Sequence, residues 1–289
     1  MGKMLIIADQ KGVGYATPRG LELARRLGYD IDVVAFIYAP LKRLKLKAPE
    51  QASVKKRLLE DREQEVQKRI DKNARDGQNV KLKVVWEKNI DNWVNRQCAS
   101  GKYLAVIKTG SNTDSLVHTS TDWQLLRECP TAVLLVAAKK WHRTHPVLVT
   151  LDLSSNVATK RKLNDKVLAH GKALAQTLGV ELEIITAIEI PTLLSDLDLV
   201  DPIAYMRDAM TDIQPQIDKL AETHDIPVSA FRCKRGPVEK VITSRAAKVR
   251  AQIVVMGTVA RSGVTARLLG NTAEKVLRHM KTDVLAIKP

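Results

Sequence analysis

The stretch Asp30-Ile-Asp-Val-Val-Ala-Phe-Ile-Tyr-Ala-Pro40 recurs in altered form as Glu181-Leu-Glu-Ile-Ile-Thr-Ala-Ile-Glu-Ile-Pro191. Each copy is an apolar run with an acidic start and a proline at its end, which is typical of a buried strand. Three further segments match across the chain: 4–9 with 147–152, 23–28 with 174–179, and 131–136 with 282–287. Self-similarity at this spacing indicates an internal duplication. The repeat therefore predicts two related domains, 1–140 and 141–289.

In each half, apolar runs alternate with amphipathic segments. In the second half they predict strands near 147–152, 182–188, 228–233, 252–256 and 283–287, and helices near 160–178, 203–224, 237–249 and 272–280. Strands that alternate with helices pair in parallel through right-handed crossovers. Nearly continuous apolar strands indicate a sheet covered on both faces. Each half is therefore predicted to be a doubly wound, Rossmann-like α/β domain with a parallel sheet.

The formal net charge of +15 is uneven, with +11 over residues 1–145 and +4 over residues 146–289. The region from Lys55 to Arg75 mixes acids and bases at helical spacing, which favours a solvated helix. Nucleic-acid binding by this basic half is the alternative, although no aromatic-interleaved RNA motif or zinc-finger spacing accompanies it. The tryptophans at 86, 93 and 123 are predicted to fill a core or an interface.

Three isolated cysteines, Cys98, Cys129 and Cys233, suggest neither a disulfide framework nor a metal site. This usage fits a reducing compartment. No apolar run is long enough to span a bilayer, and no signal peptide is expected. We therefore expect a cytoplasmic protein without a membrane span and without a bound metal.

A glycine-rich segment follows the fourth predicted strand of the second half. It runs from Gly257-Thr258 through Gly263 to Gly270-Asn271-Thr272, where the last helix is predicted to begin. Backbone amides at such a turn and at a helix start can hold phosphate oxygens. Asn271 and Glu274 have the spacing of a capping box. A glycine-rich turn with a capped helix and no ligand is the alternative interpretation.

The same segment resembles the C-terminal signature of the universal stress protein family. Nucleotide-binding members of that family carry Gly-x-x-Gly, nine residues, and then Gly-Ser or Gly-Thr. Here Gly257 and Gly270 match, whereas Ala260 and Asn271 depart from the pattern. The segment Thr121-Asp-Trp-Gln-Leu-Leu-Arg-Glu-Cys-Pro130 and the repeat are similar to the tandem type of the family.

The resemblance implies a stress-response binding protein rather than an enzyme, with its two halves packed as a pseudo-dimer. It implies a site for ATP or another adenine nucleotide, or for another phosphate-bearing metabolite, in the second half. Asp152 would lie near the nucleoside and the backbone of Ala187 near the adenine. The remaining residues of the implied site are Gly257, Thr258, Gly263, Gly270, Asn271 and Thr272.

Two other functions are kept as alternatives: a weak ATPase or nucleotidyl transferase, and sequestration of an apolar or lipid-like ligand beneath the irregular stretch 190–201. A homodimer and unknown protein partners are also compatible with the sequence. The first half has no glycine loop and carries Thr121-Asp122-Trp123 instead. Because Asp122 near a helix start would repel phosphate, this half is predicted to be structural or partner-binding.

Overall fold

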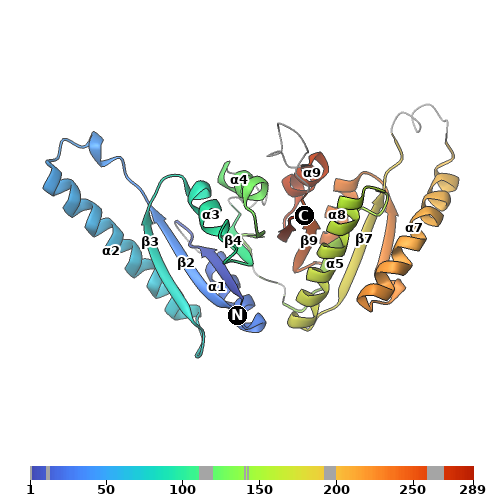
Figure 1. Ribbon diagram of the computed structural model, residues 1–289, viewed down its shortest axis with the longest axis horizontal. Coiled ribbons are helices and arrows are strands. Elements are labelled where there is room, and N and C mark those ends of the chain that lie inside the picture. Colours follow the sequence, from blue (N-terminus) through green and yellow to red (C-terminus); the bar gives the residue numbers. More distant parts are fainter. Residues whose placement is uncertain are drawn as a thin grey trace. The chain divides into compact units, whose positions relative to one another are not determined.

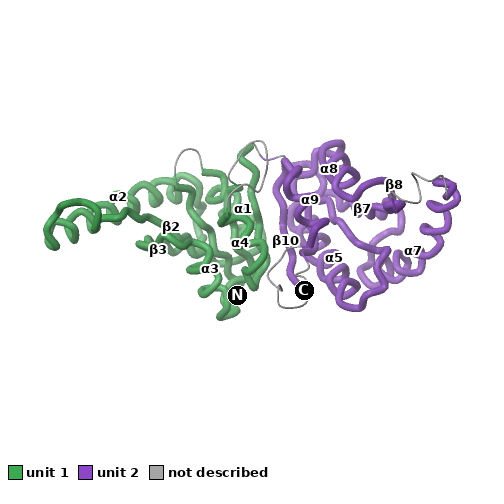
Figure 2. Tube along the Cα trace, turned by 90° about the horizontal axis from the view of Figure 1, so that it is seen from above, with its two compact units in different colours: residues 1–111, 119–139 green, residues 112–118, 140–289 purple. Residues whose placement is uncertain are grey.

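The computed structural model describes residues 2–10, 14–110, 120–139, 141, 143–191, 200–258 and 270–289. The chain divides into two compact units (Figure 2). Unit 1 contains the described residues up to 139, and unit 2 contains those from 141 onward. None of the helices within these ranges is long and apolar enough to cross a membrane.

Unit 1 alternates strands and helices around a parallel sheet (Figure 1). Its elements are β1 (Lys3–Ile7), α1 (Ala16–Leu27), β2 (Asp30–Ile37), the 3-10 turn η1 (Leu41–Arg43), α2 (Ala48–Asn73), β3 (Val80–Trp86), α3 (Ile90–Cys98), β4 (Ala105–Thr109), α4 (Ser120–Glu128) and β5 (Ala132–Val136). The spatial order is β3-β2-β1-β4-β5, and the paired strands run parallel. Chain order thus reverses beside the central strand β1.

Unit 2 repeats this topology. Its elements are β6 (Val147–Thr150), α5 (Ala158–Leu178), β7 (Leu182–Ile188), α7 (Pro202–His224), the 3-10 turn η2 (Val228–Ala230), β8 (Phe231–Arg235), α8 (Val238–Lys248), β9 (Ile253–Gly257), α9 (Asn271–His279) and β10 (Asp283–Ile287). The order β8-β7-β6-β9-β10 is again parallel. The predicted fold class, two tandem doubly wound α/β halves, is therefore confirmed.

Glycines occupy equivalent positions at the first helix of each unit. Gly28 and Gly179 follow α1 and α5 with φ angles of 67° and 66°, the left-handed conformation that the sequence predicts just after a helix. Gly20 and Gly171 face the central strands, where an added methyl group would overlap Ile6 and Val149 respectively. The first helix of each unit therefore packs closely on its central strand at equivalent places.

One predicted strand begins later than expected. Residues 228–230 form the turn η2, so β8 starts at Phe231. Such a short segment can adopt either a strand or a turn conformation. The pairing of β8 with β7 begins only at Phe231, opposite Ile184.

Two of the three cysteines come together, which their spacing in the sequence does not reveal. Cys98 ends α3 and Cys129 follows α4, and both side chains are buried free thiols. A hydrogen bond with Cys129, together with burial, raises the pKa of the Cys98 thiol. The Cys98 thiol is therefore held in the protonated form.

Candidate functional site

The residues predicted for the nucleotide site gather at the carboxyl edge of the sheet in unit 2. Asp152 lies just after β6, Ala187 lies near the end of β7, and Gly257 ends β9. The strand β6 pairs with β7 on one side and with β9 on the other. This is the position at which strand order reverses, where open parallel sheets bind their ligands.

Asp152 is held by the start of α5 but keeps access to solvent. Its side chain is 48% exposed, and its Oδ2 lies 2.9 Å from the Nζ of Lys160. The hydroxyl of Ser154 donates to Oδ1 at 2.9 Å, and the amide of Asn164 donates to the Asp152 carbonyl at 2.8 Å. The carboxylate and the Lys160 ammonium thus form a half-exposed polar pair at the strand end.

Gly257 and Thr258 both have packing roles at the end of β9. A Cβ atom at Gly257 would lie 2.7 Å from the Cδ2 of Leu163 in α5. Thr258 is buried, and its N–H and its hydroxyl donate to the carbonyl of Ile287 at 2.9 and 3.2 Å. The close approach of α5 is therefore one physical reason for glycine at 257.

The helix α9 begins with Gly270 as its N-cap residue. The first helical hydrogen bond runs from the N–H of Glu274 to the carbonyl of Gly270 at 3.0 Å. Asn271 and Thr272 are exposed in the first turn, where the helix dipole favours anions. The capping box expected from Asn271 and Glu274 is wrong, because Asn271 lies inside the helix. Gly263 and the rest of 259–269 lie outside the described residues.

The equivalent edge of unit 1 is filled by arginines from the long helix α2. Arg62 is 5% exposed, and its Nη2 donates to the carbonyl of Asp9 at 2.6 Å and to that of Ala8 at 3.4 Å. Arg69 donates to the same Asp9 carbonyl at 3.2 Å. Glu65 lies 2.7 Å from Arg62 and so offsets part of the charge. These contacts tie α2 to the end of β1.

Unit 2 places an apolar residue where unit 1 has Arg62. The buried residues of α2 are Arg62, Val66 and Ile70, and those of α7 are Ile213, Ile217 and Ala221. Both sets are spaced four apart on one face of a helix that precedes an edge strand. Arg62 thus corresponds to Ile213, which has no charged group to place over the end of β6.

A second charged pair lies in unit 1 at the end of β4. The Nζ of Lys108 is 2.6 Å from the Oδ1 of Asp122, whose side chain is fully buried. The same ammonium donates to the carbonyl of Thr109 at 2.9 Å. Asp122 does lie in the first turn of α4, as expected, but its carboxylate faces Lys108 instead of the solvent.

Thr109 occupies the place of Gly257. Each is the last residue of its strand, paired with the last residue of the neighbouring strand, Val136 or Ile287. The hydroxyl of Thr109 accepts a hydrogen bond from the N–H of Ala16 at 2.8 Å, at the start of α1. Polar groups of unit 1 thus bond to one another at the edge that in unit 2 carries Asp152 and the start of α9, although the Oδ2 of Asp9 and the Nε of Arg62 are buried without a partner among the described residues.

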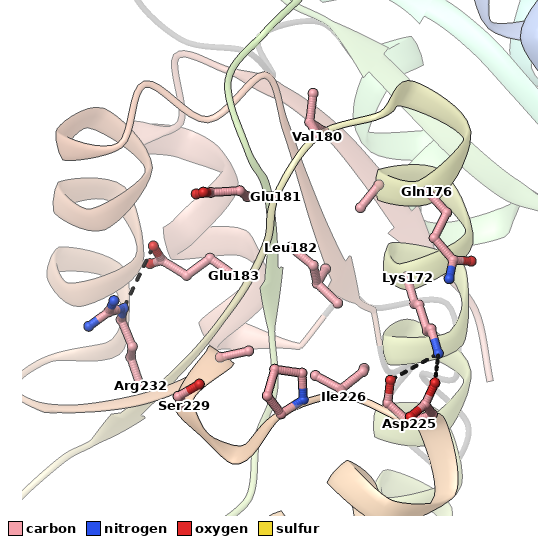
Figure 3. Close-up of a pocket in the computed structure, with 13 residues that line it drawn as sticks. Lys172, Gln176, Val180, Glu181, Leu182, Glu183, Asp225, Ile226, Ser229 and Arg232 are labelled. Atoms are coloured by element: carbon pink, nitrogen blue, oxygen red, sulfur yellow. Dashed lines mark hydrogen bonds and ion pairs between the residues drawn. The ribbon is translucent and has the colours of Figure 1, made fainter.

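A pocket of about 500 Å³ lies elsewhere in unit 2, near the amino ends of β7 and β8 (Figure 3). Leu182 and Ile226 contribute apolar surface to it. The Nζ of Lys172 lies 3.8 Å from the Oδ2 of Asp225, and the Nε of Arg232 lies 3.7 Å from the Oε2 of Glu183. None of the described residues predicted for the nucleotide site lines this pocket. In the part of the chain that the structure describes, no group of three His, Cys, Asp or Glu side chains is placed to hold a metal.

The chain was compared with protein families and with individual proteins. The model of the universal stress protein family matches residues 145–288. Universal stress protein E of Salmonella typhi is 31% identical over 216 residues, which cover 73% of this chain and 69% of that protein. The chain belongs to the universal stress protein family. The expected resemblance to the tandem universal stress protein E type is thereby confirmed.

Other universal stress proteins extend the match over more of the chain. The universal stress protein E homolog of Haemophilus influenzae is 28% identical over 250 residues, covering 84% of this chain and 81% of that protein. A putative universal stress protein from Pseudomonas aeruginosa UCBPP-PA14 has the same fold, with a TM-score of 0.70, 22% identity and coverage of 99% and 93%. The fold of that solved structure thus covers both halves of this chain.

Sequence reasoning missed the groups that fill the edge of the sheet in unit 1. Arg62 lies in a helix of mixed charge whose pattern indicated solvent exposure, and only its contact with β1 reveals its role. The pairing of Lys108 with Asp122 links a strand to the next helix and has no local signature. A comparison of Arg62 with Ile213 across the internal repeat is the signal that would have found the difference.

Proposed function

We propose that the second half binds a nucleotide or another phosphate-bearing metabolite at the carboxyl edge of its sheet, and that occupancy biases binding to a protein partner. The observation that carries this proposal is the difference between the two edges. The Asp152 side chain is 48% exposed in unit 2, whereas Arg62 and Arg69 are bonded to the equivalent strand end in unit 1. The family model also matches residues 145–288, the second half.

The chemistry of the edge suits an adenine nucleotide. The first turn of α9 offers the positive end of a helix dipole for phosphate oxygens, with the exposed side chain of Thr272 beside it. Asp152 can accept a hydrogen bond from a ribose hydroxyl, and Lys160 adds a positive charge 2.9 Å from it. In the proposal Ala187 offers backbone groups to the base. The role is binding by a cytoplasmic stress-response protein, not catalysis.

The pseudo-dimer of the two halves remains part of this proposal. Solved universal stress protein structures that match the fold over 99% of the chain support it. In such an arrangement only one of the two sites would take a ligand, so the protein would be asymmetric in function.

Replacing Thr272 with Glu tests the proposed phosphate position. A carboxylate in the first turn of a helix stabilises the helix by about 0.3–1 kcal/mol, but it would repel a phosphate at the same place. We expect Thr272→Glu to fold as well as the wild type and to lower the affinity for ATP, ADP or AMP at least tenfold, measured by calorimetry. Equal affinity in Thr272→Glu and the wild type would overturn the assignment.

The matched control is Asn92→Glu. Asn92 is exposed in the first turn of α3, which like α9 has nine residues. The substitution adds the same charge at a helix start that lies in unit 1. Nucleotide affinity should stay at the wild-type value, and a matching loss in Asn92→Glu would show that overall charge alone sets the affinity.

A further inference from the structure

A strongly basic surface lies in unit 1, beyond the ends of β2 and β3. Between residues 33 and 59 the sequence has seven lysines and arginines against one acid. The corresponding stretch of the second half, residues 184–210, has one arginine against five acids. The duplication thus produced two segments of opposite charge, of which the basic one is fully described by the structure.

The cations of this segment point into solvent. Lys42, Arg43, Lys45 and Lys47 lie between β2 and α2, and all four are exposed. No ion pair joins Lys42, Arg43 or Lys45 to another side chain of the described ranges. By contrast, Lys56 and Arg57, further along α2, lie within 4 Å of Glu60 and Asp61 respectively. We call the four residues 42, 43, 45 and 47 the basic segment.

Aromatic side chains lie at the ends of β2 and β3, and Tyr38 comes shortly before the basic segment in the chain. Tyr38 follows β2, is 49% exposed, and has its ring centroid 5.9 Å from that of Trp86 at the end of β3. The Nζ of Lys55 lies 5.3 Å from the centre of the Trp86 ring. Phe36 and Trp93 form a second, more enclosed pair with centroids 5.3 Å apart. Four of the eleven aromatic residues of the chain therefore lie at the ends of these two strands or on the helix beside them.

We propose that the basic segment, with Tyr38, Trp86 and Lys55, is a binding surface for single-stranded nucleic acid. Exposed cations attract the phosphate backbone, and a partly exposed ring offers a surface on which an unpaired base can stack. A duplex keeps its bases stacked inside and would gain only the phosphate contacts. The mixed charges of 55–75 still favour a solvated helix, and the basic segment itself lies before them in the chain.

The surface belongs to unit 1 and shares no residue with the edge of unit 2 that is proposed to take a nucleotide. The two proposals therefore fail or succeed independently: Thr272→Glu should leave oligonucleotide binding unchanged. Loss of oligonucleotide binding in that variant would overturn the separation.

The test uses the full chain and a fluorescein-labelled oligo(dT) of about 15 nucleotides, within the site size of single-strand binding folds. Anisotropy is followed across a salt series. Because each phosphate contact contributes about 0.7 to the slope of log K against log salt for single strands, removing four contacts should reduce the slope by about 2–3. The variant is Lys42→Ala, Arg43→Ala, Lys45→Ala and Lys47→Ala together.

The matched control removes four exposed lysines of unit 2 and so changes the net charge equally. Its substitutions are Lys162→Ala, Lys219→Ala, Lys240→Ala and Lys281→Ala. The control should keep the wild-type slope, and an equal loss in both variants would reduce the effect to net charge and overturn the proposal. All of these side chains are exposed, so neither variant should lose its fold, which circular dichroism checks.

Tyr38→Ala tests the aromatic part. It should weaken oligo(dT) binding about tenfold while leaving the salt slope unchanged, since stacking is not electrostatic. A duplex of the same length should bind more weakly than oligo(dT) and should be insensitive to Tyr38→Ala. Three results would overturn the proposal: equal binding of duplex and single strand, binding to anionic vesicles but not to oligo(dT), or salt-sensitive self-association without oligo(dT) binding.

Discussion

Replacing Asp122 with Ala is expected to destabilise unit 1 by about 3–5 kcal/mol, because it leaves a buried ammonium without its counterion. The Asp122 side chain is fully buried and that of Lys108 is 15% exposed, so little solvent reaches the ammonium. Lys108 would retain the carbonyl of Thr109, 2.9 Å away, as a neutral partner. Since whole domains are stable by only about 5–15 kcal/mol, unit 1 would become marginal.

The loss is measured by urea denaturation followed by tryptophan fluorescence. Three of the four tryptophans, at 86, 93 and 123, lie in unit 1, so the signal reports mainly on that unit. The double variant Asp122→Ala with Lys108→Met should recover most of the stability, because no charge is then left buried.

The control for Asp122 is an exposed pair on α2. Lys56 and Glu60 lie 3.8 Å apart with side chains that are 78% and 55% exposed, and such pairs contribute at most about 1 kcal/mol. Glu60→Ala should therefore have little effect. A loss in Asp122→Ala no larger than that in Glu60→Ala would contradict the assignment of a buried ion pair.

Replacing Arg62 with Ala is expected to cost unit 1 about 3 kcal/mol, because charged hydrogen bonds to buried carbonyls are among the stronger ones. The guanidinium donates to Asp9 at 2.6 Å, with longer contacts to Ala8 and Gln10, and pairs with Glu65. Its removal would take this donor from the carbonyl of Ala8 and leave the carbonyl of Asp9 with the longer bond from Arg69 at 3.2 Å. The same urea titration measures the loss.

Arg57 on the same helix is the matched control for Arg62. Its side chain is 84% exposed and lies 3.9 Å from Asp61. Arg57→Ala should change the free energy of unfolding by no more than about 0.5 kcal/mol. If Arg62→Ala and Arg57→Ala cost the same, Arg62 does not tie α2 to β1 in solution, and the proposed difference between the two sheet edges loses its basis.

The pattern of strands and helices was predictable because it depends on local periodicity and on the repeat. Gly28 and Gly179 marked helix ends, and the apolar runs ending at Asp9 and Asp152 marked the central strands. The predicted N-cap of α9 was wrong by one residue. Asn271 is a residue type that favours the N-cap position, but Gly270 occupies it. Element boundaries depend on backbone angles that composition does not determine.

The candidate site was only partly predictable. The strand-end positions of Asp152, Ala187 and Gly257 follow from parallel topology. The packing roles of Gly257 and Thr258 do not, because they depend on α5 and β10 approaching from distant parts of the chain. The position of Arg62 at the edge of unit 1 was unpredictable for the same reason, because it depends on α2 approaching the end of β1.

The central claim is that duplication produced one site that can take a phosphate ligand and one edge that is filled from within. Titration calorimetry of the wild-type chain with ATP, ADP and AMP, with stoichiometry as the readout, tests it most directly. We predict a saturable heat for at least one of these nucleotides, with one ligand bound per chain. Two ligands per chain, or no heat for any nucleotide with the folded protein, would contradict it.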